Sequence, residues 1–482
     1  MSKRILTTLT VIFLIAALTA PVLAEPYVAF TYSFGWGAVP CPVPYLPEEV
    51  ISTTEFGITL KEPKDLFVDE EGNMFIANSG GSSVVYISAD RSDVRQITEF
   101  DDHNGLYDLF KNPEGVFVAG NGNIYVADTG NKRIVKFDKD FKCLNIIRLN
   151  QSDVLGEKYN FLPAKVVVDD AERVFVISKN DFQGVLEISQ ESDFRGYMGS
   201  NLVNPNPVEL IWRRLMTKAQ SNKLAQFIPY EFSNISIDKS GFVFAVSSSG
   251  SETKPVKRFN SSGQDILLRQ TYSGSTSSTI TSQTFFVDVA THEDGNYSLI
   301  DYKSGKIFVY TNEGYLLYAF GGMGTLRGNF TNPSALCESN EKLYVLDMTT
   351  CMVTVFGMTE YARKISEAQF LYNDGRYDES AEIWQDVLKE NSGFELAYIQ
   401  IGKVLLRQGK DDEALEYFKL GNYRGDRATK LGGFNEAFNE VRKEFIRSYI
   451  AVILVAITVI IIGVKLLRKR DKRRSSEKRR IK

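Results

Sequence analysis

The sequence contains very little histidine: only His103 and His292 occur among its 482 residues. Both stand in polar stretches, "DDHNG" and "ATHEDG", that are typical of loops. A zinc site built on several histidines therefore lacks ligands. A Ser-His-Asp triad would have to use one of these two, and no G-x-S-x-G turn occurs. Because a phosphate-binding loop is also missing, the sequence predicts no catalytic residue, and we expect a protein that is not an enzyme.

Cysteine is also scarce, with four residues at irregular spacings: Cys41, Cys143, Cys337 and Cys351. No pair forms a C-x-x-C motif of the kind that binds metal, and four cysteines are too few for a disulfide scaffold. The spacings leave two alternatives open, one disulfide bond or buried thiols.

Long uncharged runs occur only near the two ends of the chain. Lys3 and Arg4 precede the apolar run Ile5–Leu18, and small residues lead to Ala24. This pattern predicts a signal peptide over residues 1–24, cleaved after Ala24. The alternative is a retained membrane anchor, but such a short run seldom crosses a bilayer.

The second run, "YIAVILVAITVIIIGV", begins at Tyr449 and predicts a membrane-spanning helix over residues 449–467. The alternative, a buried core helix, disagrees with the charge of the segment after it. From Lys465 to the end there are 11 basic and 2 acidic residues, a net charge of +9. Since basic clusters beside a span stay in the cytoplasm, residues 468–482 are predicted to be a cytoplasmic tail. The chain is then a type I single-pass protein of the cell membrane, with residues 25–448 outside.

Charge is unevenly distributed along the chain. The formal net charge is −4; without the tail (+9) and the signal segment (+2), residues 25–464 carry −15. An acidic exterior domain is a poor binder of nucleic acid or anionic lipid, so neither is expected as a partner.

A repeat runs through the middle of the chain. "PEGVFVAGNGNIYVADTGNKRIVKFD" at Pro113 has related copies that begin at Pro63, Pro163, Phe232, Phe285 and Pro333. Each copy reads as a strand, a polar turn, a second apolar strand ending in a polar residue, and a third strand. Six such units, spaced mostly about 40 to 50 residues apart, predict a six-bladed, all-β propeller. Within a copy we expect Asp128 to hydrogen-bond turn backbone, and Lys132 and Arg133 to face solvent.

The motif "GNIYVADTGNKRIVKF" resembles an NHL repeat, and the linker "FGGMGTLRGNFTNPSAL" is similar to the junctions between such repeats. The resemblance implies an NHL-type propeller within residues 25–357. The last copy lacks a fourth strand, so an N-terminal segment must cover its open edge. The candidates for this closing strand are "YVAFTYSF" over residues 27–34 and "TEFGITL" over residues 54–60.

The first strand of each blade lines the axis of a propeller, so residues near its start are candidates for a site at the channel mouth. These are Asp65, Glu114, Lys165, Asn234 and Asp288. Lactonase-type propellers hold a metal with similar oxygen ligands, so Ca²⁺ or another hard cation is an open alternative; otherwise these are ordinary entrance residues, and we expect no cofactor.

Between copies three and four, residues 206–228 show apolar residues at spacings of three and four, which predicts an amphipathic helix. Three roles are open for this helix: it packs on one face of the propeller as a lid, it docks a partner, or it lies on a membrane surface. Its candidate docking residues are Trp212, Arg213, Arg214 and Lys218.

The region from Tyr361 has a helical composition. Two segments align at a spacing of 34 residues, with Gly375 matching Gly409 and Trp384 matching Phe418. This period is that of the tetratricopeptide repeat (TPR), so residues 361–427 are predicted to be TPR helices and residues 432–448 a capping helix. By analogy with that family, a peptide groove would be lined by Ile365, Gln369, Tyr372, Ile399, Lys403 and Leu406. The alternative is that these helices only space the propeller from the membrane.

The whole layout is similar to uncharacterised envelope proteins of Gram-positive bacteria linked to carbohydrate ABC transport. The expected function is binding: a membrane-anchored, extracytoplasmic scaffold for a protein, peptide or glycan, with transporter subunits as possible partners. The alternative is a metal-dependent lactonase or hydrolase at the channel mouth.

Overall fold

The computed structural model describes residues 26–33, 37–102, 106–156, 158–199, 231–248, 255–267, 284–421, 438–439, 441–443, 446, 449 and 454–468. The chain divides into two compact units, residues 1–32 with 37–370, and residues 33–36 with 371–482. All six copies of the repeat lie in the first unit.

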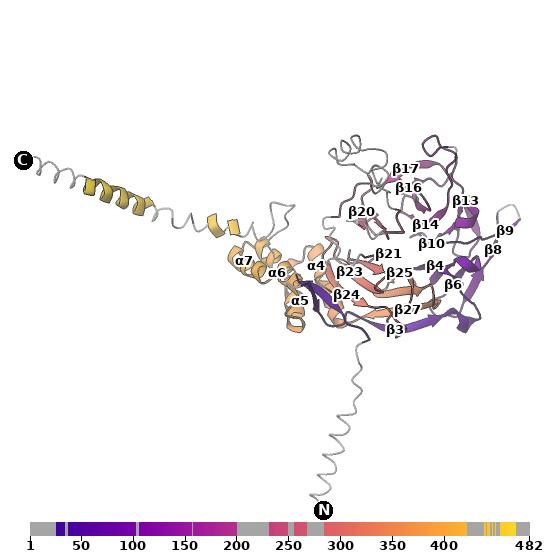
Figure 1. Ribbon diagram of the computed structural model, residues 1–482, viewed down its shortest axis with the longest axis horizontal. Helices are drawn as coiled ribbons and strands as arrows, with labels where there is room; N and C mark the ends of the chain where they lie inside the picture. Colours follow the sequence, from indigo (N-terminus) through magenta and orange to yellow (C-terminus); the bar gives the residue numbers. More distant parts are fainter. Residues whose placement is uncertain are drawn as a thin grey trace, which may run out of the picture. The chain divides into compact units, whose positions relative to one another are not determined.

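The described residues of the first unit form a six-bladed β-propeller, which confirms the predicted fold (Figure 1). The first blade consists of β4 (Pro63–Val68), β5 (Met74–Asn78), β6 (Ser83–Ile87) and β7 (Val94–Ile97), and the second of β10 (Gly115–Val118), β11 (Ile124–Asp128), β12 (Arg133–Phe137) and β13 (Cys143–Ile147). The third blade consists of β14 (Pro163–Val168), β15 (Val174–Ser178), β16 (Val185–Ile188) and β17 (Phe194–Met198), and the fourth of β18 (Asn234–Ile237), β19 (Val243–Val246) and β20 (Val256–Phe259). The fifth blade contains β21 (Phe286–Thr291), β22 (Tyr297–Asp301), β23 (Lys306–Tyr310) and β24 (Leu316–Gly321), and the sixth consists of β25 (Pro333–Ser339), β26 (Lys342–Asp347), β27 (Met352–Met358) and β3 (Tyr45–Ser52). A separate hairpin, β8 (Glu99–Asp101) and β9 (Tyr107–Leu109), follows the first blade.

The ring is closed by contacts between first strands. β4, β10, β14, β18, β21 and β25 touch one another in that order, and β25 in turn touches β4. The second strands of the first five blades are buried along their whole length, as in β5 and β11, because neighbouring blades cover both faces of a sheet. This is why these strands read as continuous apolar runs. The turns before them need a left-handed residue, and Gly72 and Gly122 supply it with φ of +88° and +81°.

An N-terminal strand completes the last blade, but the predicted segments for this role were wrong. β3 pairs antiparallel with β27 along its length, from Ser52 opposite Met352 to Tyr45 opposite Met358. The first candidate instead contributes β1 (Phe30–Ser33), which pairs with β24 and extends the fifth blade together with β2 (Gly37–Pro40). The second becomes the short 3-10 helix η1 (Thr53–Phe56).

The polar residue that ends the second strand holds the segment entering its own blade. Asp128 Oδ1 accepts the N–H of Lys111 at 2.8 Å, Asn78 accepts that of Lys61 at 2.6 Å, and Asp301 accepts that of Phe285 at 2.7 Å. The predicted Asx-type bonding of Asp128 therefore reaches the preceding linker, and the polar residue recurs because each blade must be fixed to its linker.

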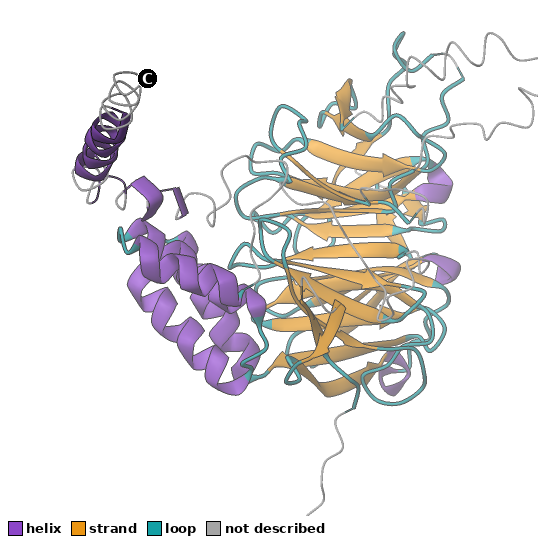
Figure 2. Cartoon of the chain, turned by 60° about the vertical axis from the view of Figure 1, so that its left-hand side comes forward, coloured by secondary structure: helices purple, strands orange, loops and turns teal. Residues whose placement is uncertain are grey.

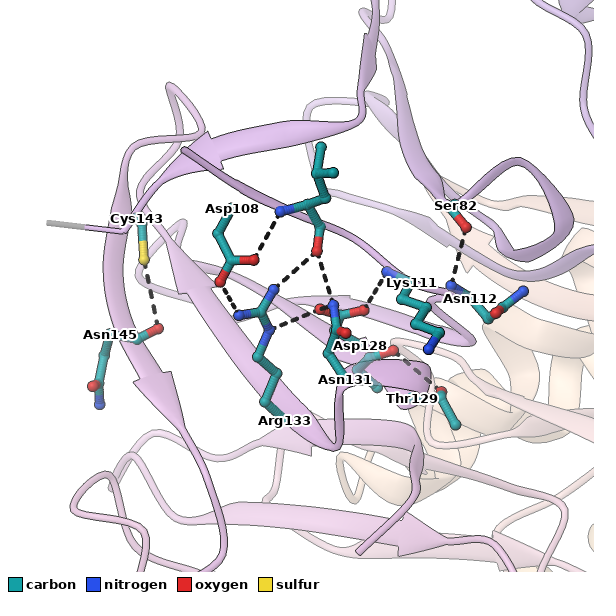
Figure 3. A network of polar contacts seen from close by, with 12 residues as sticks. Ser82, Asp108, Lys111, Asn112, Asp128, Thr129, Asn131, Arg133, Cys143 and Asn145 are labelled. Atoms are coloured by element: carbon teal, nitrogen blue, oxygen red, sulfur yellow. Dashed lines mark hydrogen bonds and ion pairs between the residues drawn. The ribbon is translucent and has the colours of Figure 1, made fainter. Parts of the chain in front are cut away.

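Figure 3 shows that Arg133 belongs to the same network, which corrects the prediction that it faces solvent. Its side chain is 2% exposed, and Nε donates to Asp128 Oδ2 at 2.8 Å. The guanidinium also pairs with Asp108 and donates to the carbonyl of Leu109. Both acceptors lie on β9, so Arg133 ties the β8–β9 hairpin to the second blade.

In the described residues from 360 to 421, the propeller is followed by helices drawn in purple in Figure 2: α4 (Glu360–Asn373), α5 (Tyr377–Glu390), α6 (Glu395–Arg407) and α7 (Asp411–Leu420). Gly375 and Gly409 have φ of +85° and +73° and form the turns before α5 and α7. In α6, a Cβ on Gly402 would come within 2.7 Å of the Phe418 ring, so glycine allows α6 and α7 to pack closely. The predicted helix-turn-helix pairs are thus present; their identity as TPR units stays a prediction.

Several predicted segments lie outside the described residues: the signal peptide, the insertion helix with its docking candidates, most of the capping helix and nearly all of the basic tail. Residues 454–468, which cover most of the predicted span and the first residue of the predicted tail, are helical. In the parts of the chain that the structure describes, no helix combines the length and the apolar character needed to cross a membrane.

Candidate functional site

The candidate site is a cavity of about 620 Å³ that follows the propeller axis. It is lined by the first strands of all six blades and by the turns that follow these strands. Its wall is apolar in the middle, where the rings of Phe67 and Phe117 meet edge to face at 5.1 Å between centroids. The polar residues lie at its two ends.

One end of the cavity is buried, and four of the five channel-mouth candidates lie there. Asp65, Lys165, Asn234 and Asp288 all line the cavity and are between 3% and 8% exposed. β4, β14 and β21 each carry a β-bulge immediately before the candidate residue. A bulge changes the direction of the next side chain. We call these four residues the axial ring.

The fifth candidate, Glu114, does not line the cavity. Its carboxylate pairs with Lys179 Nζ at 2.7 Å. The next residue, Gly115, occupies the strand position that corresponds to Asp65. A Cβ at Gly115 would lie 2.5 Å from the carbonyl oxygen of Ala164, so the second blade has no side chain at this level.

The axial ring contains a buried ion pair. Lys165 Nζ donates to Asp65 Oδ1 at 2.5 Å and to the carbonyl of Lys64 at 3.2 Å. Asp65 Oδ2 accepts the N–H of Val116 from the next blade at 2.9 Å. Burial raises the pKa of Asp65, and the Lys165 ammonium opposes this effect.

Asp288 has no ion pair of its own within the axial ring. Its two oxygens accept the N–H groups of Val289 and Leu336, both at 2.7 Å. Burial raises the pKa of Asp288 to about 7, with Lys165 opposing and Asp65 adding to the rise. The ring therefore holds two carboxyl groups and one ammonium in a water-poor environment.

Asn234 completes the ring with an amide whose orientation is fixed. Its Oδ1 accepts the N–H of Ile235 at 2.8 Å, so the amide nitrogen must point the other way. Among the described residues, nothing accepts a hydrogen bond from this Nδ2. The residue is 3% exposed and lines the cavity.

The other end of the cavity is exposed and acidic. Five residues after Asp65, Lys165, Asn234, Asp288 and the corresponding Ala335 of the last blade, the turns begin. At these places stand Glu70, Asp170, Lys239, Glu293 and Asn340. We call these five residues the open mouth. Lys239 Nζ lies 2.6 Å from Glu293 and 3.2 Å from Glu70, and so links the fourth, fifth and first blades. Sequence reasoning missed this end, although an acidic residue after the first strand recurs in several copies.

Just inside the open mouth lie Glu338 and His292. Burial raises the pKa of Glu338 to about 8, and the neighbouring Asp294 and Glu293 add to the rise. His292 is 8% exposed, its Nε2 lies 2.7 Å from Ser298 Oγ, and burial lowers its pKa. Ser298 is fully buried and is not among the cavity-lining residues, so this contact places no nucleophile in the cavity. His103 lies outside the described residues.

A hard cation in the axial ring would need several carboxylate or amide oxygens around one point. At this place the Lys165 ammonium already contacts Asp65. Over the described ranges, no group of three or more His, Cys, Asp or Glu side chains has an arrangement that could hold a metal ion.

Three of the six groove candidates on the helices are buried: Ile365, Gln369 and Ile399 are at most 2% exposed. Tyr372, Lys403 and Leu406 are half-buried. Within the second unit, Lys403 and Arg407 lie over the Tyr372 ring, at 5.8 and 5.7 Å from its centroid. The structure thus joins Tyr372 and Lys403 in one aromatic and cationic cluster of α4 and α6.

Comparison with known proteins supports the architecture. A family model described as NHL repeat matches residues 110–137, within the second blade, and the chain is therefore a β-propeller protein that contains an NHL repeat. A search of curated proteins finds no match.

Matches to solved structures have low identity and low TM-scores. Virginiamycin B lyase from Staphylococcus aureus is 11% identical with a TM-score of 0.41, covering 64% of this chain and 99% of the lyase. A PQQ-bound aldose sugar dehydrogenase from Streptomyces coelicolor is 10% identical with a TM-score of 0.39, covering 66% of this chain and 100% of the dehydrogenase. These values carry no argument about activity.

Proposed function

We propose that this protein is an exported, membrane-anchored binding protein of the bacterial cell envelope, and that the propeller cavity takes a polar ligand. The observation that carries the proposal is the ammonium of Lys165, which contacts Asp65 at the point where an enzyme of the lactonase type would need a metal. A cavity with an apolar middle and a few placed polar groups is suited to recognising a ligand.

The helices α4 to α7 supply a second binding surface in this proposal. Tyr372, Lys403 and Arg407 form a half-exposed cluster of a kind that is common in peptide-binding interfaces. We infer that a protein partner at the envelope binds here, and subunits of a carbohydrate ABC transporter are the partner we favour. The uncharged run over residues 449–467 and the basic tail support a single span with the propeller outside.

Ligand binding is tested with the detergent-solubilised full-length chain and a set of neutral and charged oligosaccharides and peptides, by isothermal titration calorimetry. We expect at least one probe to bind, and Lys165→Met together with Glu293→Gln to weaken it at least tenfold. Glu191→Gln changes an exposed acid on the β16–β17 turn, away from the cavity lining, and serves as the matched control. Equal affinity in all variants would exclude the cavity as the site. Metal-dependent turnover of a lactone would favour the enzyme instead.

The partner and the topology need separate measurements. Transporter subunits should co-purify with the full-length chain from its native membrane, and should be lost from a variant lacking residues 361–431. Protease added outside intact cells should degrade the propeller and leave the tail. A protected propeller would contradict the proposed topology.

A further inference from the structure

The charge of the cavity lining indicates what kind of ligand it attracts. Ten acidic and two basic residues line the cavity. Five of the acids have cationic partners: Asp65 with Lys165, Asp169 with Arg173, Asp238 with Arg258, and Glu70 and Glu293 together with Lys239. The excess negative charge that remains lies in a concave, partly apolar space, where fields are focused. Such a space attracts a cation and repels a carboxylate.

The open mouth already holds an ammonium group, supplied by the chain itself. Lys239 Nζ is bonded between Glu293 and Glu70. All three side chains are exposed, with Lys239 at 62%, so a ligand ammonium can exchange with that of Lys239 at little cost. Just inside, Glu338 also lines the cavity, and burial raises its pKa, with Asp294 and Glu293 adding to the rise and Lys239 opposing it.

The axial ring indicates a different chemical group. Among the described residues no acceptor pairs with the Asn234 amide nitrogen, and the residue, which is 3% exposed, lines the cavity. Beside it, each Asp288 oxygen accepts one backbone N–H and can accept another hydrogen bond. A hydroxyl group both accepts and donates, and so satisfies the two together. A ligand carboxylate would accept from Asn234 but would be repelled by Asp288.

We propose that the cavity binds an amino sugar oligomer: hydroxyl groups meet Asn234 and Asp288, and a primary ammonium meets Glu293 and Glu338. This inference rests on the proposed function, because it names the ligand class of the same cavity. In this proposal Phe67 and Phe117, which line the cavity, offer apolar surface to the sugar rings between the two ends.

Four probes separate the two recognition elements: the tetramers of glucosamine, N-acetylglucosamine and glucose, and spermidine. N-acetylation removes the charge, glucose removes the amine, and spermidine keeps amines without hydroxyls. With the full-length chain, calorimetry should give the glucosamine tetramer an affinity at least tenfold higher than any of the other three. Equal binding of the glucose tetramer would overturn the amino sugar and leave a cavity for neutral glycans. Tighter binding of spermidine would show a cation site without sugar recognition.

Two variants test which side chain recognises which group of the ligand: Glu293 the ammonium, and Asn234 the hydroxyl groups. Glu293→Gln should weaken the glucosamine tetramer at least fivefold and leave the glucose tetramer unchanged. Asn234→Ser keeps an oxygen for the Ile235 N–H but removes the amide donor, and should weaken both tetramers by the same factor, again at least fivefold. Thermal melting confirms that each variant is folded, and Glu191→Gln is the control. Binding of the glucosamine tetramer that neither variant alters would contradict the proposal. If no probe binds while a peptide does, the cavity binds a ligand but the amino sugar inference fails.

Discussion

At the scale of single residues, the stability of this propeller depends on a buried ion pair. Arg133 is 2% exposed and Asp128 is fully buried, and they share an ion pair at 2.8 Å. The Arg133 guanidinium also lies 5.3 Å from the centroid of Phe100. A buried pair of this kind contributes modestly when intact, but its disruption leaves an uncompensated charge.

Arg133→Met should therefore lower the free energy of unfolding by about 3–5 kcal/mol, measured by urea denaturation. Arg95→Met is the matched control, because Arg95 also bonds an aspartate, Asp93, but is exposed at 49%. The control should change stability little. Equal small losses in both variants would show that the network around Asp128 is not coupled to folding.

Asp288 makes the stability of the ring depend on pH. Its folded pKa of about 7 lies above the ordinary value of 3.8. Between these two values the Asp288 carboxyl is protonated in the folded state but has lost its proton in the unfolded chain. The contribution of Asp288 to the free energy of unfolding is therefore highest below pH 4 and falls as the pH rises towards 7. The loss from Asp288 is on the order of 2–4 kcal/mol.

Asp288→Asn removes this titration, so the decline of stability between pH 4 and 7 should become shallower by that amount. The variant also loses an acceptor for the N–H of Val289 or Leu336, so the slope with pH, rather than the stability at one pH, is the diagnostic quantity. Urea denaturation at half-unit pH intervals gives that slope. An unchanged slope would show that Asp288 is ionised throughout.

At the scale of residues, the sequence predicted most of the side chains that line the buried end of the cavity, but it did not predict which charged side chains are buried. Asp65, Lys165, Asn234 and Asp288 were found because repeats align their positions. Glu114 was a misaligned choice, because it stands one residue after Pro113, whereas Asp65 and Lys165 stand two residues after Pro63 and Pro163. The aligned residue is Gly115, which has no side chain to recognise in a repeat pattern. The burial of Arg133 was not predictable, since its partner Asp108 lies on a separate hairpin.

At the scale of elements, ring closure depends on β3. This strand supplies the outer edge of the last blade through its pairing with β27. Without it, β27 would present unpaired N–H and C=O groups, which are templates for pairing with another chain. The sequence indicated that an N-terminal strand was needed. It did not indicate which one, because several N-terminal segments have comparable strand patterns and only packing against β27 distinguishes them.

Deletion of residues 26–52 should therefore make the protein associate and lower its melting temperature. Deletion of residues 26–40 is the matched control, because it removes β1 and β2, which add to a fifth blade that already has four strands. Light scattering and thermal melting compare the two. A monomer of unchanged stability after the longer deletion would contradict closure by β3.

At the scale of the whole propeller, closure makes six similar sheets into one cooperative unit. Each first strand contacts two neighbours, and β25 returns to β4, so no blade can open without exposing the apolar faces of two others. An open array of repeats lacks this property, because its end units can unfold alone. The closed ring therefore predicts that distant blades become accessible to solvent together.

Two buried thiols test this prediction. Cys143 in β13 and Cys337 in β25 are free thiols at most 8% exposed, and burial raises the pKa of Cys337, so both should be unreactive in the native state. Under rising urea, alkylation followed by mass spectrometry should give the same opening free energy for both, because each becomes reactive only when the ring opens. Cys351, which is half-buried, should react earlier and provides the internal control. If Cys143 became reactive well before Cys337, the second blade would open on its own, and the ring would be a chain of separate units rather than one.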